Sequence, residues 1–111
     1  MEQILRDVCA QLGIDPNTVN ADVHFVTRCE IRELNRMHRG IDRPTDVLSF
    51  PMLDIRAGTI PTRENFSLDV NPQTGKIELG DIVVCKECAH GQTIEFLINH
   101  GFMHLLGYHH E

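Results

Sequence analysis

A group of histidines near the end of the chain constrains the fold more than any other feature. His100 and His104 are four residues apart in the stretch INHGFMHLLGYHHE, where apolar residues recur at helical spacing. On a helix this spacing places both imidazoles on one face, one turn apart, as two ligands of one metal ion require. Gly107 can end the helix, and the turn that follows can bring back His110 as a third ligand. We therefore expect a helix over residues 93–106 that carries a metal site.

Three neutral imidazoles favour zinc, with one ion per chain and a fourth position left for water, whose pKa the metal lowers towards about 7. The spacing H-x-x-x-H-x-x-G-x-x-H is similar to that of the metzincin zinc proteases. Those proteases carry a general-base glutamate directly after the first histidine, where this chain has Gly101. The pattern therefore predicts a hydrolase without the peptidase base. His109 is an alternative third ligand, although the offset favours His110.

The rest of the chain predicts one small domain over residues 1–111. Helical spacing of Ile4, Leu5, Val8 and Leu12 predicts an N-terminal helix that Gly13 and Pro16 close. Thr27 with Glu30 forms the capping box of a second helix that ends at Gly40. Strands are expected at 23–27, 46–50 and 82–85, with an irregular segment at 54–77 that includes a hairpin near 71–75. Helices and strands alternate without a strict repeat, so α+β or mixed α/β is the expected class.

Charge restricts where a nucleic acid could bind. Sixteen Asp and Glu against ten Lys and Arg give a formal charge of −6, which argues against a surface that binds phosphates everywhere. The basic residues are instead concentrated in one stretch, at Arg28, Arg32, Arg36, Arg39 and Arg43. This stretch predicts either an RNA-facing stripe or a solvated helix face balanced by Asp22, Glu30 and Glu33.

Two further features indicate the compartment. Charges at Glu2, Arg6 and Asp7 interrupt any signal-peptide core, and no membrane span is expected, so we predict a cytoplasmic protein. Cysteines in that compartment are reduced.

The pair Cys85-x-x-Cys88 has no second cysteine pair to complete a zinc site, so packing at the end of a buried strand is the favoured interpretation.

Three sequence blocks carry a family resemblance. HGFMHLLGYHH at 100–110 resembles the HGxLHLLGYDH signature of the YbeY family of metal-dependent endoribonucleases. The blocks LNRMHRGIDRPTDVLSFP at 34–51 and LGDIVVC at 79–85 support it in the same order. The resemblance implies an α+β fold with a small mixed sheet packed with helices. It also implies zinc on His100, His104 and His110, and a functionally required Arg39.

The same resemblance implies a function. Family members are single-strand-directed endoribonucleases of ribosomal RNA maturation, notably at the 16S 3′ end, and of ribosome quality control, so RNA and the small ribosomal subunit are the expected partners. A peptidase or other metallohydrolase, and a non-catalytic assembly factor with structural zinc, are the alternatives.

This chain departs from the family pattern in three places. His109 replaces the usual aspartate, the join after Cys85 is short, and the chain stops at Glu111 without the family's terminal segment. The aspartate could orient an imidazole, so His109 changes the surroundings of the metal ligands.

Overall fold

The computed structural model describes residues 2–108. Six main elements follow one another along the chain: α1 (Glu2–Leu12), β1 (Val19–Phe25), α2 (Arg28–Arg39), β2 (Val47–Pro51), β3 (Ile77–Val84) and α3 (Ile94–Leu105). Two single-turn 3₁₀ helices, η1 (Ser67–Asp69) and η2 (Lys86–Cys88), lie in the connections. Helices α2 and α3 have 12 residues each, and none of the helices within residues 2–108 has the length and apolar character needed to cross a membrane.

The three strands form one mixed sheet in the order β1-β3-β2. β1 lies parallel to β3, from Val19 opposite Ile77 to Phe25 opposite Val84, whereas β2 lies antiparallel to it. The expected α+β class and mixed sheet are confirmed. The predicted strand at 23–27 was wrong in its bounds, because pairing with β3 begins at Val19 and the chain turns after Phe25 to start α2.

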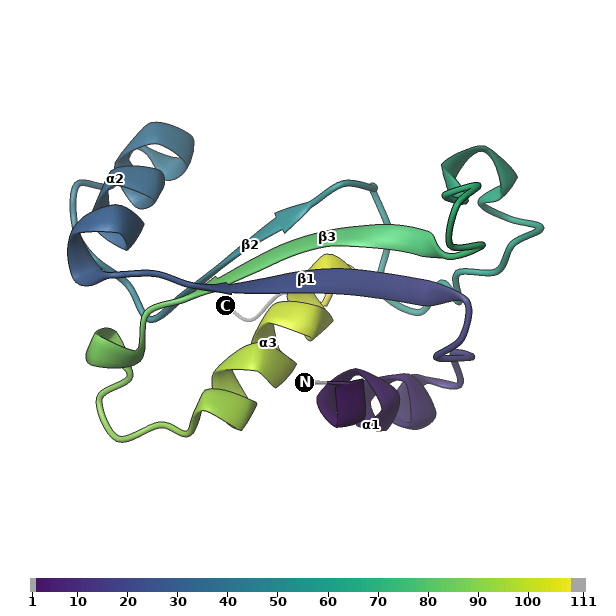
Figure 1. The fold of residues 1–111 in the computed structure, drawn as a ribbon, viewed down its shortest axis with the longest axis horizontal. Coiled ribbons are helices and arrows are strands. Elements are labelled where there is room, and N and C mark those ends of the chain that lie inside the picture. The colour runs from purple at the N-terminus through teal and green to yellow at the C-terminus, as the bar shows by residue number, and fades with distance from the viewer. Residues whose placement is uncertain (1, 109–111) are drawn as a thin grey trace.

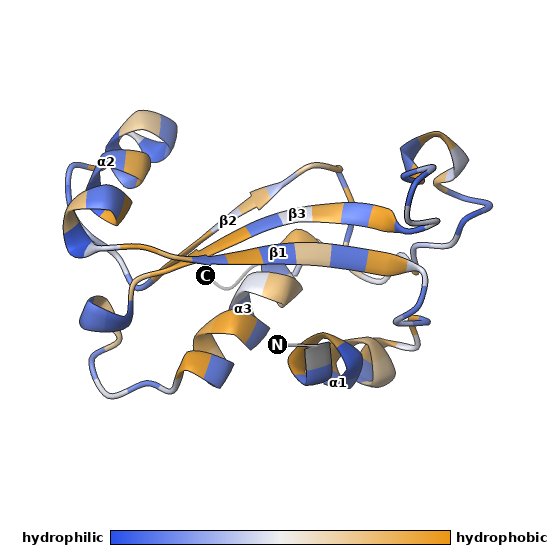
Figure 2. Cartoon of the chain, viewed as in Figure 1, coloured by the Kyte–Doolittle hydropathy of each residue, from blue (hydrophilic) through white to orange (hydrophobic). Residues whose placement is uncertain are grey.

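The sheet has different partners on its two faces. α1 and α3 cover one face and enclose the main core, while α2 packs against the other face near one end of the sheet (Figure 1). Alternation along β3 explains this division, since Ile82 and Val84 belong to the main core and Val83 belongs to the cluster under α2. Accordingly, Figure 2 shows α3 as mainly hydrophobic and α2 as rich in hydrophilic residues.

Local signals determine the ends of α2 as the sequence predicts. Thr27 Oγ1 accepts a hydrogen bond from the Glu30 N–H at 3.2 Å, and the Glu30 carboxylate accepts one from the Thr27 N–H at 3.0 Å. This reciprocal pair is the predicted capping box. At the other end Gly40 adopts a left-handed conformation with φ of 70° and closes the helix.

Candidate metal centre

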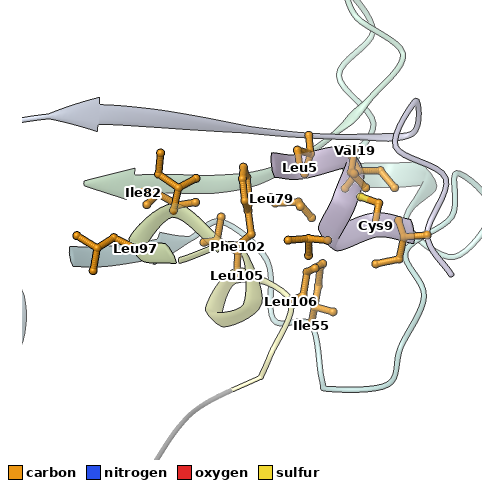
Figure 3. Packing of buried hydrophobic residues seen from close by; sticks show 14 of the residues in the cluster. Leu5, Cys9, Val19, Ile55, Leu79, Ile82, Leu97, Phe102, Leu105 and Leu106 are labelled. Atoms are coloured by element: carbon orange, nitrogen blue, oxygen red, sulfur yellow. The ribbon is translucent and has the colours of Figure 1, made fainter. Parts of the chain in front are cut away.

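Helix α3 carries His100 and His104, the two expected ligands within the described residues. Thr93 caps its N-terminus by accepting a hydrogen bond from the Phe96 N–H at 3.1 Å. The apolar residues Leu97, Ile98, Phe102 and Leu105 are buried against the sheet and α1 (Figure 3). His100 and His104 are half-buried, with ring centroids 4.4 Å apart at an interplanar angle of 62°. The predicted pairing of these imidazoles on one face of a helix is therefore present.

Gly101, directly after the first histidine, is the point where α3 approaches the sheet. A Cβ atom at this position would lie 2.6 Å from Ile82 Cγ2 and 3.0 Å from Ile82 Cγ1. Such distances are shorter than real carbon contacts allow, so position 101 must lack a side chain for the helix to pack here. The place where metzincins carry their general base is thus filled by β3.

The helix ends at the predicted glycine in a Schellman motif. The Tyr108 N–H donates to the Met103 carbonyl at 2.9 Å, and the Gly107 N–H donates to the His104 carbonyl at 3.0 Å. Gly107 has a φ of 90°, which L side chains rarely adopt. The chain therefore leaves α3 sharply, three residues after His104.

A loop far away in the sequence contacts this helix exit. A Cβ at Gly107 would lie 2.2 Å from the Ile55 carbonyl oxygen and 2.7 Å from the Ala57 nitrogen, so the two backbones are in direct contact. The Tyr108 hydroxyl accepts a hydrogen bond from the Gly58 N–H at 3.0 Å. We call residues 55–58 the exit loop. Figure 3 shows Ile55 beside Leu106 at this end of α3.

The third expected ligand, His110, lies outside the described residues, as does its alternative His109. Within residues 2–108, no group of three or more His, Cys, Asp or Glu side chains could hold a metal ion. The described part of the site nevertheless fits zinc in its chemistry, because two imidazoles on one helical face can share one tetrahedral ion. The exit at Gly107 lets the chain turn before the next candidate ligands.

Arg39 is placed on the other side of the sheet from the histidines. It is the last residue of α2, and its side chain is exposed. Its neighbour His38 contacts Phe50 of β2 with ring centroids 4.9 Å apart. β2 is an edge strand that also packs against α3. The described residues bring His100 and His104 together, but not Arg39 with them.

The arginine stripe is divided by ion pairs. Arg32 Nε lies 2.8 Å from Asp42 Oδ1, and Arg36 pairs with Glu33 one turn earlier. The hydrogen bond from Arg32 holds the pKa of the Asp42 carboxyl below its usual value, and Arg36 lowers the pKa of Glu33 in the same way. The balanced-helix interpretation therefore holds for Arg36, which pairs with the expected Glu33, whereas Arg32 pairs with Asp42 in the loop after α2. Arg39 and Arg43 remain as exposed cations towards the end of the stripe.

Cys85 and Cys88 pack in the smaller core, as expected. Cys85 is fully buried and Cys88 is 3% exposed, next to Ile31 and Val83. The two sulfur atoms are 3.2 Å apart and share a hydrogen bond. Burial raises the pKa of the Cys88 thiol, and the hydrogen bond with Cys85 raises it further. The Cys88 thiol is therefore a poor nucleophile, and the burial of both side chains agrees with a packing role.

Sequence reasoning overlooked two residues that organise the site. Asn35 is 2% exposed and donates from Nδ2 to the Arg43 carbonyl at 2.9 Å, which fastens the loop after Arg39. Its position four residues after the buried Ile31 could have revealed it as a polar residue on an apolar face. The second is Tyr108, whose tertiary partner Gly58 no local pattern could have indicated.

Fold and site together define a small α+β protein with paired histidines on its C-terminal helix and no room for a peptidase base. A family model described as Endoribonuclease YbeY matches residues 1–111. The chain therefore belongs to the endoribonuclease YbeY family.

Several known proteins are similar to this chain. "Endoribonuclease YbeY" of Acetivibrio thermocellus is 44% identical over 93 residues, which cover 74% of this chain and 55% of the relative. The protein of the same name from Thermoanaerobacter sp. is 37% identical over 123 residues, covering 100% of this chain and 73% of the relative. A solution structure of a Thermotoga maritima protein is 32% identical, with a TM-score of 0.46, and covers 99% of this chain and 61% of that one. This chain thus spans between about half and three quarters of the length of these proteins.

Proposed function

We propose that the chain is a zinc-dependent endoribonuclease that acts on single-stranded regions of ribosomal RNA, in the cytoplasm, during maturation of the 16S 3′ end and ribosome quality control. The observation that carries this proposal is the family match over residues 1–111, combined with the paired imidazoles of His100 and His104. Curated relatives that match this chain bear the name Endoribonuclease YbeY. A role on the small ribosomal subunit accords with a binding surface limited to the arginine-rich stretch.

In this proposal His100, His104 and His110 hold one zinc ion. When bound, zinc supplies Lewis acidity at the phosphodiester. α3 keeps the first two imidazoles on one face, because it is capped at Thr93 and packed against Ile82 at Gly101.

Arg39 has the complementary role of binding phosphate oxygens. Its planar guanidinium matches two phosphate oxygens and would stabilise the charge that develops during cleavage. Arg32 and Arg36 are each held by a carboxylate, so part of their charge is already neutralised. Arg39 is exposed at the end of α2, where an RNA strand along the β2 edge could reach it.

The packing at Gly101 favours RNA over peptide as the substrate. A metzincin peptidase needs a carboxylate directly after its first histidine ligand. Here that position faces Ile82 with no space for a side chain, so position 101 cannot supply the base. Phosphodiester cleavage does not depend on this particular carboxylate.

Cleavage of a single-stranded RNA is expected only when the protein carries metal. The purified chain, incubated with zinc and a single-stranded oligonucleotide, should yield internal fragments, and prior chelation should stop the reaction. Denaturing gel electrophoresis measures the products, and a peptide of similar length is the control substrate. Peptide turnover without RNA turnover would favour the peptidase alternative, and intact RNA with normal zinc content would favour the assembly factor.

Replacement of Arg39 is expected to slow cleavage without removing the metal. Arg39→Ala should lower kcat/KM on RNA by about 10²–10³-fold, the usual cost of losing one donor that stabilises transition-state charge. Arg39→Lys should recover only part of the rate, since an ammonium lacks the planar fork.

The matched control is Arg6→Ala, which removes another exposed arginine, from α1. It should leave the rate unchanged, and both variants should retain zinc and thermal stability, because exposed substitutions have small effects on folding. An unchanged rate for Arg39→Ala would remove this residue from the mechanism.

A further inference from the structure

The attachment of the exit loop to the end of α3 is not needed to complete the helix. The Schellman hydrogen bonds already satisfy the carbonyls of Met103 and His104 within the helix itself. The exit loop makes two further contacts with the residues that come next. Its backbone at Ile55 and Ala57 lies directly against Gly107, and its Gly58 N–H donates to the Tyr108 hydroxyl at 3.0 Å.

These contacts restrict the direction of the chain after the helix. The backbone contact with Ile55 and Ala57 leaves no space for a side chain at Gly107. The second fixes the far end of the Tyr108 side chain, while its ring packs against the main core. A residue held at its backbone, its ring and its hydroxyl retains little freedom to rotate.

Tyr108 lies between two expected ligands in the sequence. His104 is four residues before it, and His110 is two residues after it. Ordering a segment only when the metal ion binds costs affinity, and holding it in place in advance avoids that cost.

We propose that Tyr108 is a positioning residue for the metal site, and that its hydrogen bond to Gly58 fixes the direction in which the chain leaves α3 towards the expected ligand His110. This inference rests on the proposed function, because it assumes that His110 is a ligand. The exit loop thereby becomes part of the metal centre, although it contributes no ligand of its own. Position 108 requires tyrosine because phenylalanine would keep the ring but lose the acceptor.

The test is a titration of the metal-free full chain with cobalt(II), followed by its visible absorption bands. Tyr108→Phe is expected to weaken cobalt binding about tenfold, the lower end of the effect seen when a group that orients a ligand is removed. Its absorption bands should also change in intensity, because losing this restraint on the chain before His110 would alter the coordination geometry. If Tyr108 has a purely structural role, Tyr108→Phe would lower the melting temperature and leave these bands unchanged.

Two control variants separate the possible outcomes. Thr93→Ala removes the cap at the opposite end of α3 and should lower the melting temperature without changing cobalt affinity. His110→Ala should weaken cobalt binding more than Tyr108→Phe does. Circular dichroism of each metal-free variant establishes that it is folded.

If Tyr108→Phe binds cobalt as tightly as the unsubstituted protein and His110→Ala binds it more weakly, the role of Tyr108 is overturned and the proposed metal site stands. It is also overturned if Thr93→Ala weakens binding equally, or if metal-free Tyr108→Phe is unfolded. Unchanged binding by His110→Ala would refute the three-histidine site and the inference together.

Discussion

Replacing His104 by alanine is expected to abolish zinc retention and RNA cleavage together. The imidazoles of His100 and His104 lie with ring centroids 4.4 Å apart. Without His104, His100 is the one expected ligand left on this face of α3, so a three-nitrogen site cannot be completed. Removing a group that only orients a ligand costs about 10–100-fold in metal affinity, so loss of the ligand itself should cost more than about a hundredfold. Metal analysis after dialysis and the RNA cleavage assay measure the two effects.

The control for this variant is a histidine outside α3. His24 is exposed on β1, with Nε2 3.0 Å from Asp81 Oδ1. His24→Ala should therefore keep both zinc and cleavage. RNA cleavage that survives His104→Ala, with zinc absent, would refute the metal-dependent mechanism.

Introducing the metzincin base by Gly101→Glu is expected to unfold the protein rather than create a peptidase. The new side chain would begin 2.6 Å from Ile82 Cγ2 and would place a carboxylate between α3 and β3. Overpacking and burial of an unpaired charge together should cost about 3–5 kcal/mol, a large share of the stability of a domain of this size. Denaturant unfolding followed by circular dichroism measures the loss.

Two comparisons show whether the cause is steric. Gly101→Ala should cost about 1–2 kcal/mol, because the clash with Ile82 outweighs the helix-forming advantage of alanine. Met37→Glu adds the same charge at a position on α2 that is 64% exposed, and should change stability little. A stable Gly101→Glu protein with peptidase activity would contradict both the packing argument and the preference for RNA.

The helices could be predicted because their signals are local. The capping box of Thr27 and Glu30 and the cap at Gly40 formed as expected. Thr93 likewise begins α3, and Gly107 follows its end with a positive φ. Each of these signals acts between residues only a few positions apart, so the sequence pattern contains both partners.

The strands were predicted less well, because their bounds depend on pairing. β1 begins at Val19 and β3 begins at Ile77, several residues before the apolar runs that predicted them. These two residues lie opposite one another in the parallel register, although 58 positions separate them in the sequence. An apolar run marks the buried part of a strand, while its hydrogen-bonded length depends on its neighbour.

In the candidate site, too, local features could be predicted from the sequence and tertiary contacts could not. The i, i+4 spacing alone was sufficient to predict that His100 and His104 share a face of α3. The sequence also contains five clustered arginines, but it left open which of them form ion pairs. In the folded structure Arg32 pairs with Asp42 and Arg36 pairs with Glu33, whereas Arg39 is exposed.

By itself, the sequence determined the three helices, the spacing of the expected ligands and the family, because these depend on local periodicity and on motifs of adjacent residues. Only the tertiary structure decided why position 101 is glycine and what holds Tyr108. Ile82 lies 19 positions from Gly101, and Gly58 lies 50 positions from Tyr108. Such contacts exist only after the sheet and α3 have packed together, so steric exclusion at Gly101 and the hydrogen bond at Tyr108 are properties of the folded chain.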